Sequence, residues 1–269
     1  PLRPLGTRNP ILSSPCHMWG PMRLWRRLER EAWGRYTRLS TGSDLTVAIK
    51  VLDRQYDLDR KRRRQDYLGR EIMIAASLQH DCVIKLHKEI IEQPDNDGNL
   101  RRCLLMEYID GFNMRKLIQE RTLNINEMLS ICIRLARGLD FLHQHGIVHR
   151  DIKPENFLFS RDLRQVKIVD FGLSKSTASW RTRWLKERGG TFRYMSPEQL
   201  NKRKLDARSD IFSYGLTMYE LFTGRHPCPG PDRKQIKYQI VSSKFRYDPP
   251  SKHNPEIPSA LDKIILKAL

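Results

Sequence analysis

Four side chains in the middle of the chain are of the types that transfer of a phosphoryl group needs. Asp151, Lys153 and Asn156 lie together in the segment 149–156, which reads HRDIKPEN, and Asp170 follows at the start of an Asp-Phe-Gly triplet. Carboxylate and amide oxygens are hard ligands that suit Mg²⁺, and a lysine ammonium neutralises phosphate oxygens. Phosphoryl transfer asks a protein chiefly for such positioning and neutralisation of charge. A purely structural network of buried charges is the alternative interpretation.

Strand patterns dominate the sequence before this segment. Residues 45–52 read LTVAIKVL, which is rich in β-branched side chains, and the turn-forming TGSD at 41–44 bounds them. Residues 92–102 predict a polar turn, and 103–106 predict a short apolar strand. Residues 66–79 instead predict a helix. The side chains that we expect to face inward from it are Tyr67, Ile72, Ile74, Ala75 and Leu78.

Helical patterns dominate after residues 109–111. Apolar side chains recur at helical spacing before Gly146, which is a good helix stop. They are Met128, Ile131, Leu135, Leu139 and Leu142. Residues 211–222 are apolar on nearly every side, which indicates a buried helix that ends at Gly224. A small β-rich part therefore precedes a larger helical part, and the two join near residues 107–110.

The bulk composition is that of an ordinary globular protein with a basic surface. The 269 residues are 39% hydrophobic and 30% charged, and 49 Lys and Arg against 31 Asp and Glu give a net charge of +18. This charge bears on partners rather than on the fold. No run of apolar residues is long enough to span a membrane. The five cysteines include no C-x-x-C pair, so we expect a reducing compartment and no structural zinc.

The two ends of the chain indicate that it belongs to a longer protein. The first 28 residues contain arginines and prolines but no Asp or Glu, which predicts an irregular basic leader. A transit peptide is the alternative interpretation of this start. Because the chain begins with Pro1 rather than Met, we expect the natural N-terminus to lie upstream. Residues 261–269 stop in the middle of a helical pattern, so we expect the C-terminus to be truncated as well.

Four motifs in a fixed order resemble the signature of the eukaryotic-type protein kinases. They are VAIK at 47–50, HRDIKPEN at 149–156, DFG at 170–172 and SPE at 196–198. The resemblance covers about residues 22–269. It implies an α+β fold with a small β-rich N-lobe, a larger helical C-lobe and an active site between the lobes. The implied boundaries are a leader at 1–22, the N-lobe at 23–109 and an incomplete C-lobe at 110–269.

The resemblance assigns a role to each residue of the catalytic segment. Asp151 would accept or orient the proton of the substrate hydroxyl, and Lys153 would neutralise the γ-phosphate of ATP. Asp170 and Asn156 would hold the Mg²⁺ ions that bridge the phosphates. His149, which in isolation looks like a general base, would instead be a packing residue. Kinases that carry an arginine at Arg150 commonly use it to receive a phosphate on the activation loop. Candidate phosphorylation sites there are Ser176, Thr177, Ser179 and Thr182.

The nucleotide would lie between the lobes. Lys50 would bind the α- and β-phosphates, with Glu71 as its partner on a helix. The ring of adenine would lie between Ala48 and Leu158. Met106 would narrow the back of this pocket. Backbone groups that would meet the edge of the adenine belong to Glu107 and Ile109.

The phosphate-binding loop departs from the family pattern. A G-x-G-x-x-G motif is expected there, but residues 29–34 read EREAWG, and only Gly34 remains. Glycines let backbone N–H groups approach phosphates closely, whereas Glu29 and Glu31 would add bulk and negative charge. The loop therefore supports a second hypothesis, in which the chain is a pseudokinase that acts as a scaffold or allosteric partner. If the two carboxylates face solvent instead, the departure is harmless.

The substrate class follows from the same resemblance. The order Asp151-x-Lys153-Pro154-Glu155-Asn156 and the segment GTFRYM at 190–195, with Thr191 near Asp151, are similar to Ser/Thr kinases. Kinases that select arginine beside the phosphorylated residue often carry a carboxylate just after the segment that joins the two lobes. This chain has Asn113 at that position. The segment 170–198 is rich in Lys and Arg, so we expect an acidic or phosphorylated protein partner.

Other partner classes have less support. A basic nucleic-acid-associated protein is a third hypothesis, but charge is its only support, so we expect no nucleic-acid partner. The run RKRRR at 60–64 is either a solvated basic loop or an anion or nuclear-import patch. We therefore expect a cytoplasmic protein, with the nucleus as the alternative.

Overall fold

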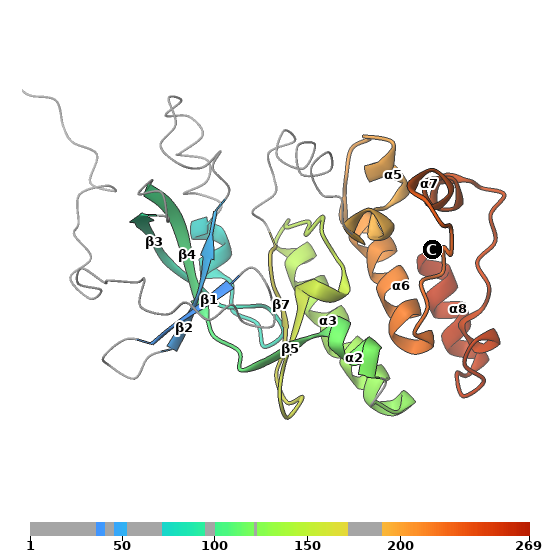
Figure 1. The fold of residues 1–269 in the computed structure, drawn as a ribbon, viewed down its shortest axis with the longest axis horizontal. Coiled ribbons are helices and arrows are strands. Elements are labelled where there is room, and N and C mark those ends of the chain that lie inside the picture. The colour runs from blue at the N-terminus through green and yellow to red at the C-terminus, as the bar shows by residue number, and fades with distance from the viewer. Residues whose placement is uncertain (1–35, 41–45, 53–71, 95–99, 121–122, 172–189) are drawn as a thin grey trace, which may run out of the picture.

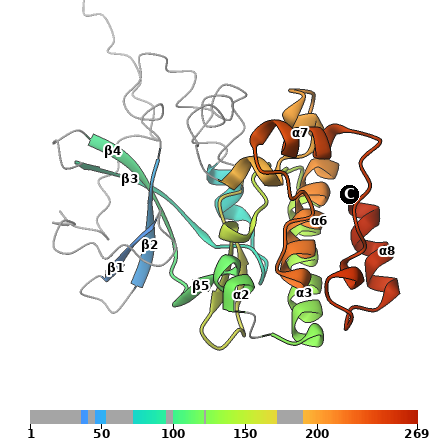
Figure 2. The same ribbon diagram turned by 45° about the vertical axis from the view of Figure 1, so that its right-hand side comes forward.

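The computed structural model describes residues 36–40, 46–52, 72–94, 100–120, 123–171 and 190–269 (Figure 1). Within these ranges, strands dominate before the connector near residue 108 and helices dominate after it. The α+β fold with two lobes, which the sequence predicts, is therefore confirmed. Figure 2 shows the four-stranded sheet on one side of the molecule and the helices on the other. No helix among the residues described is long and apolar enough to span a membrane.

An antiparallel four-stranded sheet with the order β1-β2-β4-β3 forms the N-terminal lobe. Its strands are β1 (Tyr36–Ser40), β2 (Thr46–Val51), β3 (Leu86–Pro94) and β4 (Leu100–Glu107). Strand β2 is buried on both faces. Ala48 faces the main core, whereas Val47 and Ile49 pack with Cys103 and Leu105 in a smaller cluster. Burial on both faces explains why this strand is a continuous apolar run rather than an alternating one.

The predicted turn at 92–102 is too wide, and the predicted strand at 103–106 is too short. Residues Glu92–Pro94 belong to β3, and β4 already begins at Leu100. The register pairs Glu92 with Arg102, and the carboxylate of Glu92 forms an ion pair with Arg102 Nε at 3.4 Å. Polarity alone predicts a turn here, because charged side chains lie on this part of the sheet. The ion pair across the two strands nevertheless stabilises their pairing.

Residues 72–77 are helical and carry one misassigned side chain. Ile72 and Ala75 are buried, as predicted, and so is Leu78 just beyond the helix. Ile74, also predicted to face inward, is 49% exposed. Residues two positions apart in a helix lie on nearly opposite sides, so Ile72 and Ile74 cannot both face the same core. Tyr67 lies outside the described residues.

The C-terminal lobe combines a small sheet with helices. The sheet has the order β5-β6-β7 and lies between the N-terminal sheet and the helices (Figures 1 and 2). Its strands are β5 (Gly111–Asn113), β6 (Phe157–Ser160) and β7 (Val166–Ile168). The helices are α2 (Met114–Glu120), α3 (Ile125–Gln144), α5 (Pro197–Leu200), α6 (Ala207–Thr223), α7 (Arg233–Val241) and α8 (Ser259–Ala268). Short 3-10 turns are η2 (Pro154–Asn156), η3 (Gly190–Tyr194) and η4 (Pro250–Lys252).

Helices α3 and α6 form the centre of this lobe. All five side chains predicted to line α3 are buried, and Asn124 and Glu127 form a capping box at its start. Helix α3 ends at Gln144, and Gly146 follows with φ of 71°, so the predicted stop is confirmed. Helix α6 is buried along most of its length and ends at Gly224 as predicted. Its one departure from the prediction within 211–222 is Ile211, which is 41% exposed.

Gly111 provides a test of the packing between β5 and β6. A Cβ atom there would overlap the backbone carbonyl of Phe159, which cannot move without breaking the strand pair. Gly111→Ala should therefore lower the free energy of unfolding by about 3 kcal/mol or more. Gly146→Ala is the matched control, because its added Cβ meets no atom within 4 Å and only the positive φ is strained. That strain costs about 1 kcal/mol. Urea unfolding of both variants measures the difference, and equal losses would contradict the assigned close approach.

Candidate active site

A buried carboxylate on α6 holds the loop that carries Asp151. Asp210 accepts hydrogen bonds from the backbone N–H groups of His149 and Arg150, both at 2.7 Å, and its Oδ2 also lies 2.8 Å from His143 Nε2. Arg150 has a φ of 69°, a conformation that side chains other than glycine rarely adopt. On its other side, the carbonyl of Arg150 accepts a hydrogen bond from Gln199 Nε2 at 2.8 Å. The backbone just before Asp151 is thus fixed by α6 and α5.

His149 is a packing residue, in agreement with the expectation. Its side chain is fully buried. Its Nδ1 lies 3.3 Å from the backbone N–H of Asp151, and its Nε2 lies 2.8 Å from the carbonyl oxygen of Val169. Because Nδ1 accepts a hydrogen bond, Nε2 must carry the proton and donate to Val169. The imidazole therefore joins the catalytic loop to the segment that carries Asp170 and has no nitrogen left for proton transfer.

Asp151, Lys153 and Asn156 lie together, as predicted from the motif. Lys153 Nζ is 3.0 Å from Asp151 Oδ2. The amide nitrogen of Asn156 donates to the same oxygen at 3.1 Å and to the backbone carbonyl of Asp151 at 2.6 Å. The side chain of Lys153 is only 3% exposed. Two donors therefore orient a single carboxylate, and one of them carries a positive charge.

Lys50 and Asp170 join the two lobes. Lys50 Nζ on β2 is 2.5 Å from Asp170 Oδ1, and the carboxylate is almost fully buried. Asp170 has a φ of 68°, so the chain turns sharply at this residue. Just before it, the N–H of Val169 donates to the carbonyl of Asn156 at 3.0 Å. The structure therefore brings Lys50, Asp170 and Asn156 to one place. Glu71, the predicted partner of Lys50, lies outside the described residues.

The residues predicted to surround an adenine lie in the main core between the lobes. Ala48 is the Cα partner of Met106 across β2 and β4. Ala48, Met106, Ile109 and Leu158 all belong to one buried cluster. Glu107 is held on three sides. Its backbone N–H donates to the carbonyl of Lys85 at 3.0 Å, its carboxylate accepts from the N–H of Lys85 at 2.7 Å, and Lys167 Nζ lies 2.8 Å from the same carboxylate.

The donor set suits a magnesium ion bound largely by its substrate. Asp170 contributes a carboxylate, and Asn156 contributes an amide oxygen that is not the atom engaged with Asp151. Within the described part of the chain, no group of three or more His, Cys, Asp or Glu side chains could hold a metal alone. Mg²⁺ is commonly bound through one or two carboxylates together with phosphates and water. These residues therefore fit Mg²⁺ carried with a nucleotide.

Several predicted site residues cannot be placed. Gly34 and the rest of the loop at 29–34 lie outside the described residues, as does the whole segment 172–189 with its candidate phosphorylation sites. Thr191 lies in η3, and only its backbone is described. The proposed roles of these residues remain predictions.

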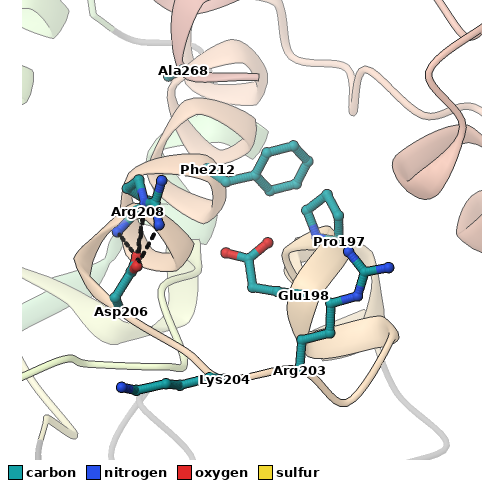
Figure 3. A pocket seen from close by; sticks show the side chains of 8 residues that line it. All are labelled: Pro197, Glu198, Arg203, Lys204, Asp206, Arg208, Phe212 and Ala268. Carbon is teal, nitrogen blue, oxygen red and sulfur yellow. Dashed lines mark hydrogen bonds and ion pairs between the residues drawn. The ribbon is translucent and has the colours of Figure 1, made fainter.

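Glu198, the last residue of the SPE motif, is held by a side chain of α6. Its Oε1 accepts a hydrogen bond from Ser209 Oγ at 2.5 Å. Figure 3 shows this carboxylate pointing into a cavity of about 410 Å³ between α5 and α6, with Phe212 beside it. Arg208 lines the same cavity but pairs with Asp206 at 2.8 Å. This cavity is lined by none of the predicted catalytic residues.

A cluster around Arg115 was missed by sequence reasoning. Arg115 on α2 lies 3.0 Å from Glu155 Oε1, 2.6 Å from Glu220 Oε1 and 2.5 Å from the hydroxyl of Tyr194. That hydroxyl in turn donates to Glu220 Oε2. A lone glutamate in the apolar run of α6 was the available sequence signal, because a buried carboxylate needs a cationic partner. Nothing in the sequence indicated that Arg115 is the partner.

The charges of this cluster are strongly coupled. Burial alone would lower the pKa of the Arg115 guanidinium, but Tyr194, Glu220 and Glu155 outweigh burial and hold that pKa above its ordinary value. Burial and the carboxylate of Glu220 raise the pKa of Tyr194 well above its usual range. Arg115 is therefore charged and Tyr194 is neutral at every physiological pH.

Comparison with protein families gives a match over most of the chain. The family model described as "Protein kinase domain" matches residues 35–269. A probable serine/threonine-protein kinase of Streptomyces coelicolor is 37% identical over 83% of this chain and 32% of its own length. The serine/threonine-protein kinase PknB of Mycolicibacterium smegmatis is 34% identical over 83% of this chain and 35% of its own length. The chain thus spans about a third of these relatives.

A comparison with solved structures agrees on the fold. The kinase domain of Mycobacterium tuberculosis PknI superposes with a TM-score of 0.60 at 24% identity. The match covers 87% of this chain and 82% of that one.

The imidazole of His226, which lies edge-on to the ring of Tyr194, makes the stability of the protein depend on pH. Burial, with Arg193 next in importance, lowers the pKa of His226 from 6.5 to about 4. Between these values the unfolded chain binds a proton that the folded protein does not, so stability is complete above pH 6.5 and falls toward pH 4. Parent protein should lose about 2 kcal/mol from this group between pH 7 and pH 5. In His226→Gln that part of the loss should vanish, whereas exposed His145→Gln should behave as the parent. Identical pH dependence of parent and His226→Gln in urea unfolding would contradict the assignment.

Proposed function

The chain belongs to the protein kinase family, and on that premise we propose that it transfers the γ-phosphoryl group of ATP to serine or threonine hydroxyls of proteins. The observation that carries the proposal is the assembly of Lys50, Asp151, Lys153, Asn156 and Asp170 at one place between the lobes. Lys50 comes from β2, Asp151 and Lys153 from the loop before η2, Asn156 from η2 itself, and Asp170 from the segment after β7. Relatives that are named as serine/threonine kinases support the same hydroxyl class, and none of the named relatives favours the scaffold alternative.

The carboxylate of Asp151 is the group that we assign to the substrate hydroxyl. Lys153 and Asn156 hold it at 3.0 Å and 3.1 Å, so its orientation is set before a substrate arrives. In this role it orients the hydroxyl and accepts its proton as the oxygen attacks phosphorus. The ammonium of Lys153 offsets negative charge at the same point. Preorganised charge of this kind costs no rearrangement during the reaction.

Asp170 and Asn156 are the residues that we assign to Mg²⁺. When bound, the ion bridges phosphate oxygens and neutralises the charge that develops on them. Lys50 is assigned to the α- and β-phosphates. Its contact with Asp170 at 2.5 Å sets the ammonium beside the metal ligand. Since both groups lie at the junction of the lobes, the phosphates would be held by both lobes at once.

The adenine site is assigned to the core near the connector. Ala48 and Leu158 would enclose the ring, and the backbones of Glu107 and Ile109 would meet its edge. The lobes are proposed at 23–109 and 110–269, after a leader at 1–22. We propose that Gly34 and Glu71 complete the nucleotide site.

A small cavity lies beside Asp151. It measures about 20 Å³, roughly the space of one water molecule. Its walls are Arg150, Asp151, Ile152, Tyr194, Met195 and Gln199. A cavity of this size can hold one small polar group beside Asp151.

The proposed partner is an acidic or phosphorylated protein, and the proposed location is the cytoplasm. Lys202, Arg203 and Lys204 are exposed in the turn between α5 and α6. Opposite charges across an interface speed encounter, and like charges disfavour it. The exposed cations therefore favour a substrate that carries negative charge.

Asp151→Asn tests the assigned proton acceptor. The substitution keeps the size of the side chain but removes its negative charge, so phosphate transfer should fall by roughly a hundredfold or more. The melting temperature should change little, because both donors still find an oxygen. Asp140→Asn, an exposed change on α3, is the matched control and should keep parent activity. Radiolabel transfer from ATP measures all three proteins. Asp151→Asn at the parent rate would mean that another group takes the proton.

Asp170→Asn tests the assigned metal ligand by binding rather than by activity. Loss of the carboxylate should weaken nucleotide binding in the presence of Mg²⁺ by roughly tenfold, since a charged ligand is lost. Binding measured in EDTA should be almost unchanged. Titration calorimetry with a non-hydrolysable ATP analogue gives both values. If the variant lost equal affinity with and without Mg²⁺, Asp170 would act on the nucleotide and not on the metal.

A further inference from the structure

Arg115 forms ion pairs with both members of an acidic pair beside the catalytic residues and offsets half of the charge of that pair. The acidic pair consists of Glu155, which lies between Lys153 and Asn156 in the catalytic segment, and Glu220 on α6. Arg115 bridges them with contacts of 3.0 Å and 2.6 Å from two different nitrogens. The side chain of Glu220 is 11% exposed, whereas that of Glu155 is 42% exposed. One partner thus lies at the surface and the other lies beneath it.

Tyr194 connects this pair to the small cavity at Asp151. Its hydroxyl accepts a hydrogen bond from Arg115 and donates one to Glu220. Tyr194 is also one of the residues that line this cavity, together with Asp151 and Ile152. The guanidinium of Arg115 also lies 5.8 Å from the centre of the Tyr194 ring. Arg115 therefore contacts a residue that lines the cavity beside Asp151.

An arginine of a substrate would make the same contacts with the acidic pair that Arg115 makes from within the chain. A guanidinium satisfies carboxylates through several directed donors, and a pair of carboxylates with a tyrosine offers matching acceptors. Here the chain supplies the guanidinium itself, so a cationic substrate side chain would find the acceptors engaged. An incoming arginine would also meet the positive charge of Arg115, and like charges at an interface cost binding energy.

On this basis, which rests on the proposed kinase function, we propose that Arg115 is a specificity-determining residue. Its guanidinium occupies the carboxylates of the acidic pair. It thereby excludes substrates that carry arginine next to the phosphorylated hydroxyl. The exposed cations Lys202, Arg203 and Lys204 then leave acidic sequences as the favoured class. Removal of Arg115 converts the acidic pair into a site for a substrate arginine.

The test compares matched peptides on matched proteins. Three peptides share one acceptor threonine and carry either arginine, glutamate or alanine on its N-terminal side. The proteins are the parent, Arg115→Ala, and the double variant Arg115→Ala with Glu220→Gln. Arg134→Ala is the control, since that arginine on α3 contacts the carbonyl oxygens of Leu163 and Arg164 instead. Values of kcat/KM are measured at moderate salt, and peptide binding is measured separately by fluorescence anisotropy.

The parent and Arg134→Ala should prefer the glutamate peptide. In Arg115→Ala the ratio of the arginine peptide to the alanine peptide should rise by roughly tenfold, the value of one charge-assisted hydrogen bond. The double variant should lose that gain. A folding defect alone would lower all three peptides together and leave their ratios unchanged. Unchanged ratios in Arg115→Ala would overturn the proposal.

The parent alone can overturn the proposal, even where the variant does not fold. If the parent prefers the arginine peptide, the proposal is wrong. If no peptide is phosphorylated but anisotropy shows the switch in binding, the proposal on Arg115 holds and the proposed kinase activity fails. If peptides are phosphorylated without any switch, the activity holds and the role of Arg115 fails.

Discussion

The buried carboxylate of Asp210 is the constraint on which the catalytic arrangement depends. It accepts two backbone N–H groups, from His149 and Arg150, and these bonds hold Arg150 in a conformation with φ of 69°. An ionised group with 1% of its surface exposed requires such donors to offset its loss of hydration. The backbone just before Asp151 is therefore held firmly in place. With this turn fixed on α6, the carboxylate of Asp151 meets Lys153 and Asn156.

Among the residues that the structure describes, strand β2 brings the N-terminal lobe to the site. Strand β2 is anchored on both faces by apolar side chains, and its Lys50 crosses to Asp170. The segment that carries Asp170 is itself tied to the catalytic loop, by the imidazole of His149 and by the bond from Val169 to Asn156. The lobes thus share one polar network at the point where phosphates would lie. Specificity can then vary at its edge, where Arg115 holds the acidic pair, without disturbing the catalytic centre.

The sequence predicted what depends on local pattern and on motif, and it missed what depends on long-range pairing. The stripe of α3 and the stop at Gly146 follow from helical period and glycine geometry, and both are confirmed. Ile74 was assigned to the wrong face because an apolar side chain on a short helix does not by itself indicate direction. Arg115 was missed because its partners lie far away in the chain, and single-sequence patterns carry no record of such contacts. The domain boundaries and the roles of Gly34 and Glu71 stay predictions.

The most direct measurement of the central claim is transfer of label from γ-³²P-ATP by the purified protein to a generic protein substrate, followed by phosphoamino-acid analysis. We expect label on serine or threonine that requires Mg²⁺ and is lost in EDTA, with an initial rate proportional to the amount of protein added. If the protein binds ATP and Mg²⁺ yet transfers no label, or places the label on tyrosine, the proposed function is wrong.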